Sequence, residues 1–145
     1  QREGFTLIEF AVVLGVLALI VILGLPVGLE NYQNYILSYE VKNLVAVLRR
    51  AETLSITQAH STSYGVAFLP ERLVIFQGAS YVSRNQAFDE TYDKSATVNV
   101  TITPLISEVV FTPISGLPSV TTTFVFSNAV NSLRVELNAQ GIVDW

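Results

Sequence analysis

The chain has 145 residues, of which 50% are hydrophobic and only 14% are charged, so it is long enough for one compact domain. Its net charge of -4 gives no general attraction to nucleic acid or to anionic membrane surfaces. The absence of cysteine excludes disulfides, thiolate metal sites and cysteine nucleophiles, and one histidine leaves little scope for acid–base or metal chemistry. The mean hydropathy of +0.48 is high for a soluble protein and indicates that part of the chain meets lipid.

The excess of hydrophobic residues is concentrated near the N-terminus, where residues 10–29 carry no charge. As a helix this run is about 30 Å long, which matches the hydrocarbon core of a bilayer. A secretory signal peptide has a shorter apolar stretch, roughly 7–15 residues, and ends at a small-residue cleavage site that residues 29–32 do not offer. The sequence therefore predicts one transmembrane segment followed by one soluble head. Arg2 is the only basic residue before the run, which favours a cytoplasmic N-terminus.

Glu9 lies at the edge of this apolar run. A carboxylate at membrane depth costs roughly 2.5–3.5 kcal/mol unless a partner neutralises it. One interpretation is an interfacial glutamate that the positive end of the helix dipole favours. The other is a carboxylate that pairs with a cation from another chain, and physical reasoning alone leaves both open.

The sequence of residues 4–9, Gly-Phe-Thr-Leu-Ile-Glu, followed by an apolar helix, resembles the processing and assembly signature of type IV pilins and of the pseudopilins of type II secretion systems. The resemblance implies that a prepilin peptidase cuts after Gly4, which makes residues 1–4 a leader remnant, and methylates the new amino terminus at Phe5. It implies that Glu9 pairs with the amino terminus of a neighbouring subunit. Pro26 resembles the helix-loosening proline of many such proteins.

These implied roles agree with elementary energetics. A buried amine and carboxylate attract each other, whereas leaving one of them unpaired costs several kcal/mol, so the Glu9 pair would fix the register between subunits. Pro26 removes a backbone donor, and each flanking glycine lowers helix propensity by up to about 1 kcal/mol. We therefore expect a kink or a melted turn at Pro26.

Residues 31–58 have the pattern of an amphipathic helix that continues out of the membrane segment and packs one face on the head. Tyr32, Tyr35 and Tyr39 lie where this helix emerges, and an interfacial aromatic belt is the favoured interpretation over subunit packing. The apolar positions at helical spacing are Leu37, Val41, Leu44, Val45, Leu48, Ala51 and Leu54, opposite Lys42, Asn43, Arg49, Arg50 and Thr53.

The periodicity changes to two after His60, which predicts a β region over residues 63–145. Six strands are expected at residues 63–69, 73–77, 97–103, 107–112, 120–127 and 133–138, with residues 142–145 as a candidate seventh. Residues 78–95 form the longest stretch expected to be irregular. The predicted fold is α+β: a long N-terminal helix packed on a mostly antiparallel head formed by residues 30–145.

The order of these elements is similar to that of the GspH/FimT group of minor pseudopilins and minor pilins. The segments that carry the similarity are the helix 44–58, the strand 64–68, residues 110–113 with Gly116, and the hairpin 133–141. With the signature at residues 4–9, the resemblance spans nearly the whole chain.

The sequence offers little chemistry for catalysis, so we expect no enzyme activity, no cofactor and no metal. Asp89, Glu90 and Asp93 form the one acidic cluster, but they lack the spacing of a calcium-binding loop, and His60 has no ligand-type neighbour. No Gly-x-Ser-x-Gly nucleophile motif is present.

The interpretation that follows is a minor pseudopilin or minor pilin of a type II secretion or type IV pilus system, built into a short filament through its N-terminal helix. Its expected partners are other pilin or pseudopilin subunits, the prepilin peptidase and, before assembly, inner-membrane lipid, with the head outside the cytoplasm.

One alternative is a DNA-binding minor pilin of an uptake pilus. No nucleic acid is expected, because residues 133–145 carry one arginine, Arg134, against Glu136 and Asp144. Trp145 is expected to pack on the core more readily than to stack on a base. The other alternative is a membrane-anchored binding or enzyme head with a chance prepilin motif.

Overall fold

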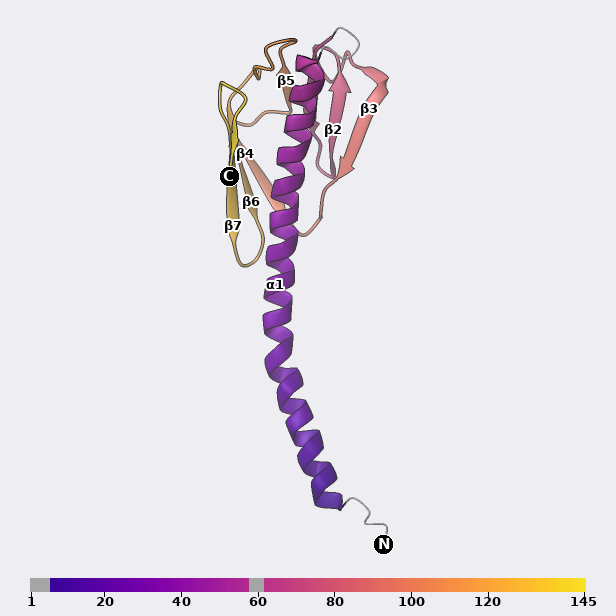
Figure 1. Ribbon diagram of the computed structural model, residues 1–145, viewed down its shortest axis with the longest axis vertical. Helices are drawn as coiled ribbons and strands as arrows, with labels where there is room; N and C mark the ends of the chain where they lie inside the picture. Colours follow the sequence, from indigo (N-terminus) through magenta and orange to yellow (C-terminus); the bar gives the residue numbers. More distant parts are fainter. Residues whose placement is uncertain (1–5, 58–61) are drawn as a thin grey trace.

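The structure, a computed structural model, describes residues 6–57 and 62–145, without the side chains of residues 23–28. One long helix, α1 (Leu7–Ile56), runs through the molecule, and the β-rich head is built around its C-terminal half (Figure 1). The N-terminal half of α1 extends away from the head as a stalk. The expected α+β fold, a long N-terminal helix packed on an antiparallel head, is confirmed.

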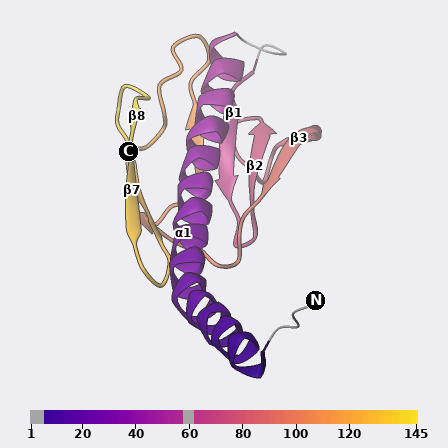
Figure 2. The same cartoon turned by 60° about the horizontal axis from the view of Figure 1, so that its bottom comes forward.

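The helix α1 has 50 residues, which corresponds to about 75 Å. It begins after the N-cap residue Thr6 and ends at the C-cap residue Thr57. A kink or a melted turn was expected at Pro26; the helix is continuous through position 26, so there is no melted turn. Its axis is nevertheless curved rather than straight (Figure 2).

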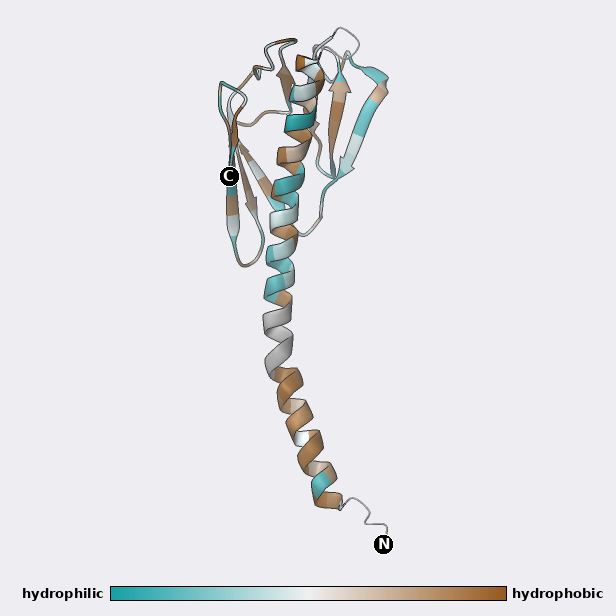
Figure 3. Ribbon diagram, viewed as in Figure 1, coloured by the Kyte–Doolittle hydropathy of each residue, from teal (hydrophilic) through white to brown (hydrophobic). Residues whose placement is uncertain are grey.

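The two halves of α1 differ in what covers them. Between Leu7 and Ile22, twelve large apolar side chains are 49–88% exposed. Figure 3 shows that this part of the stalk is mostly hydrophobic. In the described part of the chain, no helix has both the length and the apolarity needed to cross a membrane. In the other half, six of the seven predicted stripe residues are buried and Leu54 is half-buried, while Lys42, Arg49, Arg50 and Thr53 are exposed. The amphipathic pattern therefore predicted the face that packs on the head.

The described residues form two four-stranded sheets in which every paired strand is antiparallel. One sheet has the order β3-β2-β1-β5 and the other β4-β6-β7-β8, and α1 contacts both. The strands are β1 (Tyr64–Phe68), β2 (Arg72–Gln77), β3 (Asn85–Asp93), β4 (Asn99–Thr103), β5 (Glu108–Phe111), β6 (Thr122–Ser127), β7 (Ser132–Leu137) and β8 (Val143–Asp144).

The strand β3 lies within residues 78–95, so the expectation of an irregular stretch there is wrong, and eight strands replace the expected six or seven. It pairs with β2 from Arg72 opposite Asp93 to Ile75 opposite Glu90, followed by a shift in register before Gln77. Every residue of β3 is exposed or half-buried. Because neither face of this edge strand is buried, its sequence lacks the apolar alternation that marks a strand.

The core lies between α1 and the inner faces of the two sheets. Phe111 and Phe124 are fully buried there, and the rings of Phe68 and Phe124 meet across the sheets with centroids 5.0 Å apart. A smaller cluster of Ala67, Val74 and Phe76 lies on the outer side of the first sheet. The two sheets therefore form one domain on a common helix.

Candidate assembly surfaces

The start of α1 is fixed by a capping box between Thr6 and Glu9. The carboxylate oxygen Oε2 of Glu9 accepts hydrogen bonds from the backbone N–H of Thr6 and from its hydroxyl, both at 2.8 Å. In return, the N–H of Glu9 donates to the Thr6 hydroxyl at 3.4 Å. The second oxygen, Oε1, accepts no hydrogen bond from any described residue. Glu9 thus stabilises its own helix start, in line with the interfacial interpretation.

The four residues that the resemblance assigns to processing and assembly do not form one site. Gly4 and Phe5 lie outside the described residues. Glu9 and Pro26 are both on α1, but 17 residues of helix, about 26 Å, separate them. Their roles in processing and assembly therefore remain predictions.

The head is attached to α1 by polar contacts at three levels. Near the base, the side-chain amide of Asn128 donates to the backbone carbonyl of Gln33 at 3.0 Å. Further along, Glu40, only 5% exposed, accepts the backbone N–H of Ser95 at 2.9 Å. At the far end, Ser55 bonds to the first residue of β1. These contacts anchor the head at several points along the helix.

Ser55 is the most enclosed of these anchors, with no exposed surface. Its hydroxyl oxygen accepts the backbone N–H of Tyr64 at 2.9 Å, and its hydroxyl donates to the carbonyl of the same residue at 3.3 Å. Its backbone carbonyl accepts the N–H of Ile114 at 3.1 Å. One serine therefore joins the last turn of α1 both to β1 and to the turn after β5.

Two of the three carboxylates in the acidic cluster of β3 pair with arginines. Arg50 on α1 holds Glu90 with two bonds, Nε to Oε2 at 2.6 Å and Nη2 to Oε1 at 2.7 Å, and the Tyr92 hydroxyl donates to Oε2 at 3.0 Å. The hydrogen bond from Arg50 holds the pKa of Glu90 below its ordinary value. Arg84 pairs with Asp89 at 2.8 Å.

Asp89 and Glu90, two of the three carboxylates in the cluster, already face a guanidinium, which leaves the cluster poorly suited to a cation. No three His, Cys, Asp or Glu side chains of the described residues are arranged to hold a metal ion. His60 lies outside the described residues.

The distal end of the head, beside the last turn of α1, presents an apolar projection that we call the distal knob: Ile56, Ile114 and Leu117. Their side chains are 44%, 69% and 46% exposed. Gly116, whose φ is +67°, lies so close to Ile56 that a Cβ there would be 2.8 Å from its side chain. Ile114 also has a positive φ of 69°, which is rare for a β-branched residue. Such a conformation costs roughly 1–3 kcal/mol and is retained only where the surroundings enforce it.

The opposite end of the head carries an apolar cavity of about 280 Å³ that we call the proximal groove. It lies between α1 and the ends of the second sheet. Its apolar lining comes from Leu29, Tyr32, Ile36, Val98 and Ala129, with Gln33, Thr97 and Asn128 at its polar parts. The groove therefore lies where the helix leaves the head.

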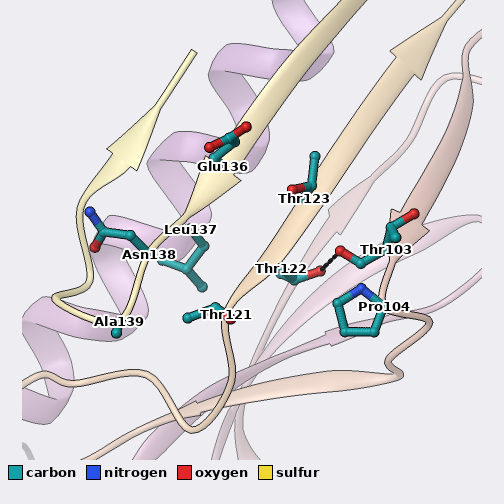
Figure 4. A pocket seen from close by; sticks show the side chains of 9 residues that line it. All are labelled: Thr103, Pro104, Thr121, Thr122, Thr123, Glu136, Leu137, Asn138 and Ala139. Atoms are coloured by element: carbon teal, nitrogen blue, oxygen red, sulfur yellow. Dashed lines mark hydrogen bonds between the residues drawn. The ribbon is translucent and has the colours of Figure 1, made fainter.

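A second hollow, of about 380 Å³, lies among the ends of β4, β6 and β7 (Figure 4). Its one carboxylate, Glu136, pairs with Arg134 at 2.6 Å, and the Asn138 side-chain oxygen accepts two backbone N–H groups of its own turn. The Thr122 hydroxyl donates to the carbonyl of Thr103 at 3.4 Å. These groups serve local structure and form no nucleophile–base pair.

Trp145 lies outside the core. Its side chain is 59% exposed, so the expectation that it packs on the core is wrong. It follows the two-residue edge strand β8, where there is little sheet to cover it.

Comparison with known proteins gives matches in structure alone. No protein-family profile matches the chain, and no curated protein sequence matches it. Two crystal structures of the type IV minor pilin FimU from Pseudomonas aeruginosa match with TM-scores of 0.62 and 0.61, at 17% and 16% identity. They cover 74% of this chain and 86% and 90% of the FimU chains. The minor pseudopilin EpsH of the type 2 secretion system of Vibrio cholerae matches with a TM-score of 0.55 at 12% identity, over 74% of this chain and 93% of EpsH. The chain therefore has a type IV pilin-like fold, related to that of the GspH/FimT group.

Proposed function

We propose that the protein is a minor pilin or minor pseudopilin subunit that is assembled into a short filament through α1 and has no catalytic role. The observation that carries the proposal is the stalk, with twelve exposed large apolar side chains between Leu7 and Ile22 on a pilin-like fold. Full burial of such a side chain is worth about 1.5–3 kcal/mol, so this surface strongly favours lipid or other helices over water.

The proposal includes a membrane stage and a processing step. Residues 5–29 are held in the inner membrane before assembly, with the head outside the cytoplasm, and the uncharged run of residues 10–29 supports this placement. A prepilin peptidase removes residues 1–4 and methylates Phe5, by resemblance of the motif at residues 4–9.

Glu9 then joins neighbouring subunits. Its oxygen Oε2 is held by Thr6 of its own chain, while Oε1 is directed to no described residue and is available for the amino terminus of a neighbour. An ammonium and a carboxylate enclosed together are costly to separate, so a misplaced neighbour would leave both charges unpaired. The pair would therefore set the position of each subunit along the filament.

The variant Glu9→Gln tests this role, because glutamine also serves at this position of a capping box and so keeps the helix start while removing the charge. We expect normal insertion and normal loss of residues 1–4, but a lower fraction of the chain in sheared filaments. Mass spectrometry of the N-terminus reports cleavage and methylation, and immunoblotting of the filament fraction reports assembly. The matched control is Lys42→Gln, which removes an exposed charge from the same helix.

Two results would contradict the proposal. Normal incorporation of Glu9→Gln would remove the pairing role of the carboxylate. An uncleaved N-terminus in cells that contain the peptidase would remove the pilin interpretation altogether.

A further inference from the structure

We propose that the proximal groove holds the upper part of a phospholipid acyl chain while the protein is in the membrane, before assembly. The inference rests on the proposed function, because it requires residues 10–29 to lie in the bilayer. The proposed function places lipid around the stalk alone. The inference adds a lipid contact made by the head.

The base of the second sheet is fixed to α1 just above the apolar run. The turn between β6 and β7, residues 128–131, is bonded to two consecutive residues of the helix. The Asn128 side-chain amide donates to the backbone carbonyl of Gln33 at 3.0 Å. The Asn131 side-chain amide donates to the side-chain oxygen of Asn34 at 2.7 Å. The Asn128 side-chain oxygen accepts two backbone N–H groups of its own turn, which closes it. In Figure 1 this turn lies where the stalk leaves the head.

The two helix positions place the turn in the headgroup layer of a bilayer. A hydrocarbon core of about 30 Å within a total thickness of about 40–45 Å leaves a polar layer of about 5–7.5 Å on each side. Residues 10–29 fill the core, so the core ends near Leu29. Gln33 is four residues further along the helix, about 6 Å, and lies within the polar layer. Glu40, which holds Ser95 after β3, is about 17 Å beyond Leu29 and lies outside it.

The proximal groove continues the apolar surface of the stalk into the head. Leu29, the last residue of the apolar run, is exposed and is also part of the groove lining. The remaining apolar lining comes from Tyr32, Ile36, Val98 and Ala129. No charged side chain of the described residues lines the groove, so it offers no group that would bind a phosphate or an ammonium. Its chemistry therefore suits the hydrocarbon part of a lipid.

The size and the polar edge of the groove suit an acyl chain close to its ester bond. A dry apolar cavity of about 150 Å³ accommodates benzene, so a groove of about 280 Å³ has room for about ten chain carbons. Gln33 and Thr97 lie at its polar parts. The Gln33 side-chain amide bonds to no other described residue, so it is available to donate to a glycerol ester.

Lipid is the apolar occupant that this position supplies before assembly. Elements at the membrane surface bury their apolar side about 5–10 Å deep, at the boundary between headgroups and acyl chains. A neighbouring subunit reaches the groove only in the filament, where its side chains would replace the lipid. In the membrane, the contact would hold the head at a fixed height on the bilayer.

Photo-cross-linking from within the bilayer tests the inference. We would reconstitute the full chain into phosphatidylcholine vesicles that contain a small share of a phosphatidylcholine with a photoactivatable diazirine on its acyl chain, close to the ester bond. After illumination, trypsin separates the two lipid contacts, because it leaves the stalk in the peptide 3–42 and the groove residues of the second sheet in the peptide 95–134. We expect lipid on both peptides, attached at residues 97–98 or 128–129 in the second. The peptide 73–84, from the first sheet and its distal loop, should stay at background.

The outcomes separate the two proposals. If the peptide 3–42 carries no lipid, the stalk is not in the bilayer, and both the proposed function and the groove contact are overturned. If the peptide 3–42 is modified but the peptide 95–134 is modified no more than 73–84, or only away from the groove, the groove contact alone is overturned.

The variant Ala129→Trp places a large ring at the groove and should fill it. We expect the lipid on peptide 95–134 to fall several-fold and the lipid on peptide 3–42 to stay the same. The matched control Ala46→Trp makes the same exchange at an exposed position of α1, about 26 Å beyond Leu29, and should leave both modifications unchanged. Equal labelling of the head in Ala129→Trp and in the parent chain would show that the lipid lies elsewhere and would overturn the inference.

Discussion

Replacing Ser55 by alanine should destabilise the head far more than a serine-to-alanine exchange usually does on a helix. The substitution removes the acceptor of the Tyr64 N–H bond at 2.9 Å and the donor to its carbonyl, at a position with no exposed surface. A buried N–H that loses its acceptor costs about 1–3 kcal/mol. The better helix propensity of alanine returns about 0.5 kcal/mol. The expected net loss is therefore about 0.5–2.5 kcal/mol.

The assay is thermal unfolding of the full chain in detergent micelles, followed by circular dichroism of the head. At about 2–4 °C per kcal/mol for a chain of about this length, the midpoint should fall by roughly 1–10 °C. The control is Ser38→Ala, on the same helix, because the Ser38 hydroxyl bonds to no other described residue and is half-buried. If Ser55→Ala melts at the temperature of the parent chain, or if Ser38→Ala loses as much, the reasoning about the buried hydroxyl is wrong.

Three further predictions concern other parts of the chain. The hydrogen bond from Arg50 lowers the pKa of Glu90 in the folded protein. The stability that this pair contributes is therefore present above the pKa of Glu90 in the unfolded chain, about 4.3, and is lost as the pH falls through the lower pKa of the folded state. The urea midpoint should therefore drop more between about pH 5 and pH 3 in the parent than in Glu90→Gln, and equal drops would contradict the pairing. Gly65→Ala places a Cβ 2.6 Å from an aromatic ring atom and should cost about 1–3 kcal/mol by urea unfolding, whereas Gly15→Ala, with open space around it, should cost nothing. Thr6→Val removes an N-cap worth about 1 kcal/mol, so amide exchange in the first turn of α1 should be about five-fold faster, and Thr6→Ser should restore the parent rate.

Local patterns in the sequence predicted the parts of the fold that bury one regular face. The stripe from Leu37 to Leu54 repeats at helical spacing because one side of α1 faces the core. The strands β4, β6 and β7 alternate because one face of their sheet is covered. The start of α1 also has a local signature, since Thr6 and Glu9 have the spacing of a capping box.

Features that depend on long-range contacts could not be predicted in this way. The strand β3 has no buried face of its own and is fixed by pairing with β2 and by the Arg50–Glu90 bridge across 40 residues. The left-handed Ile114 runs against its own propensity and is held by Ser55, 59 residues earlier. The groove and the knob each join α1 to a turn that is distant in sequence, so neither is visible in a local pattern.

The continuity of α1 between stalk and head determines how a mechanical load would travel. Because the same helix that extends below the head also forms part of its core, tension on the stalk is transmitted directly into the domain, without a hinge or linker to absorb it. Its anchors at Gln33, Glu40 and Ser55 are spread along the axis, so a pull in that direction loads them together in shear rather than breaking them one at a time. The head is thereby built to resist extraction of its own helix.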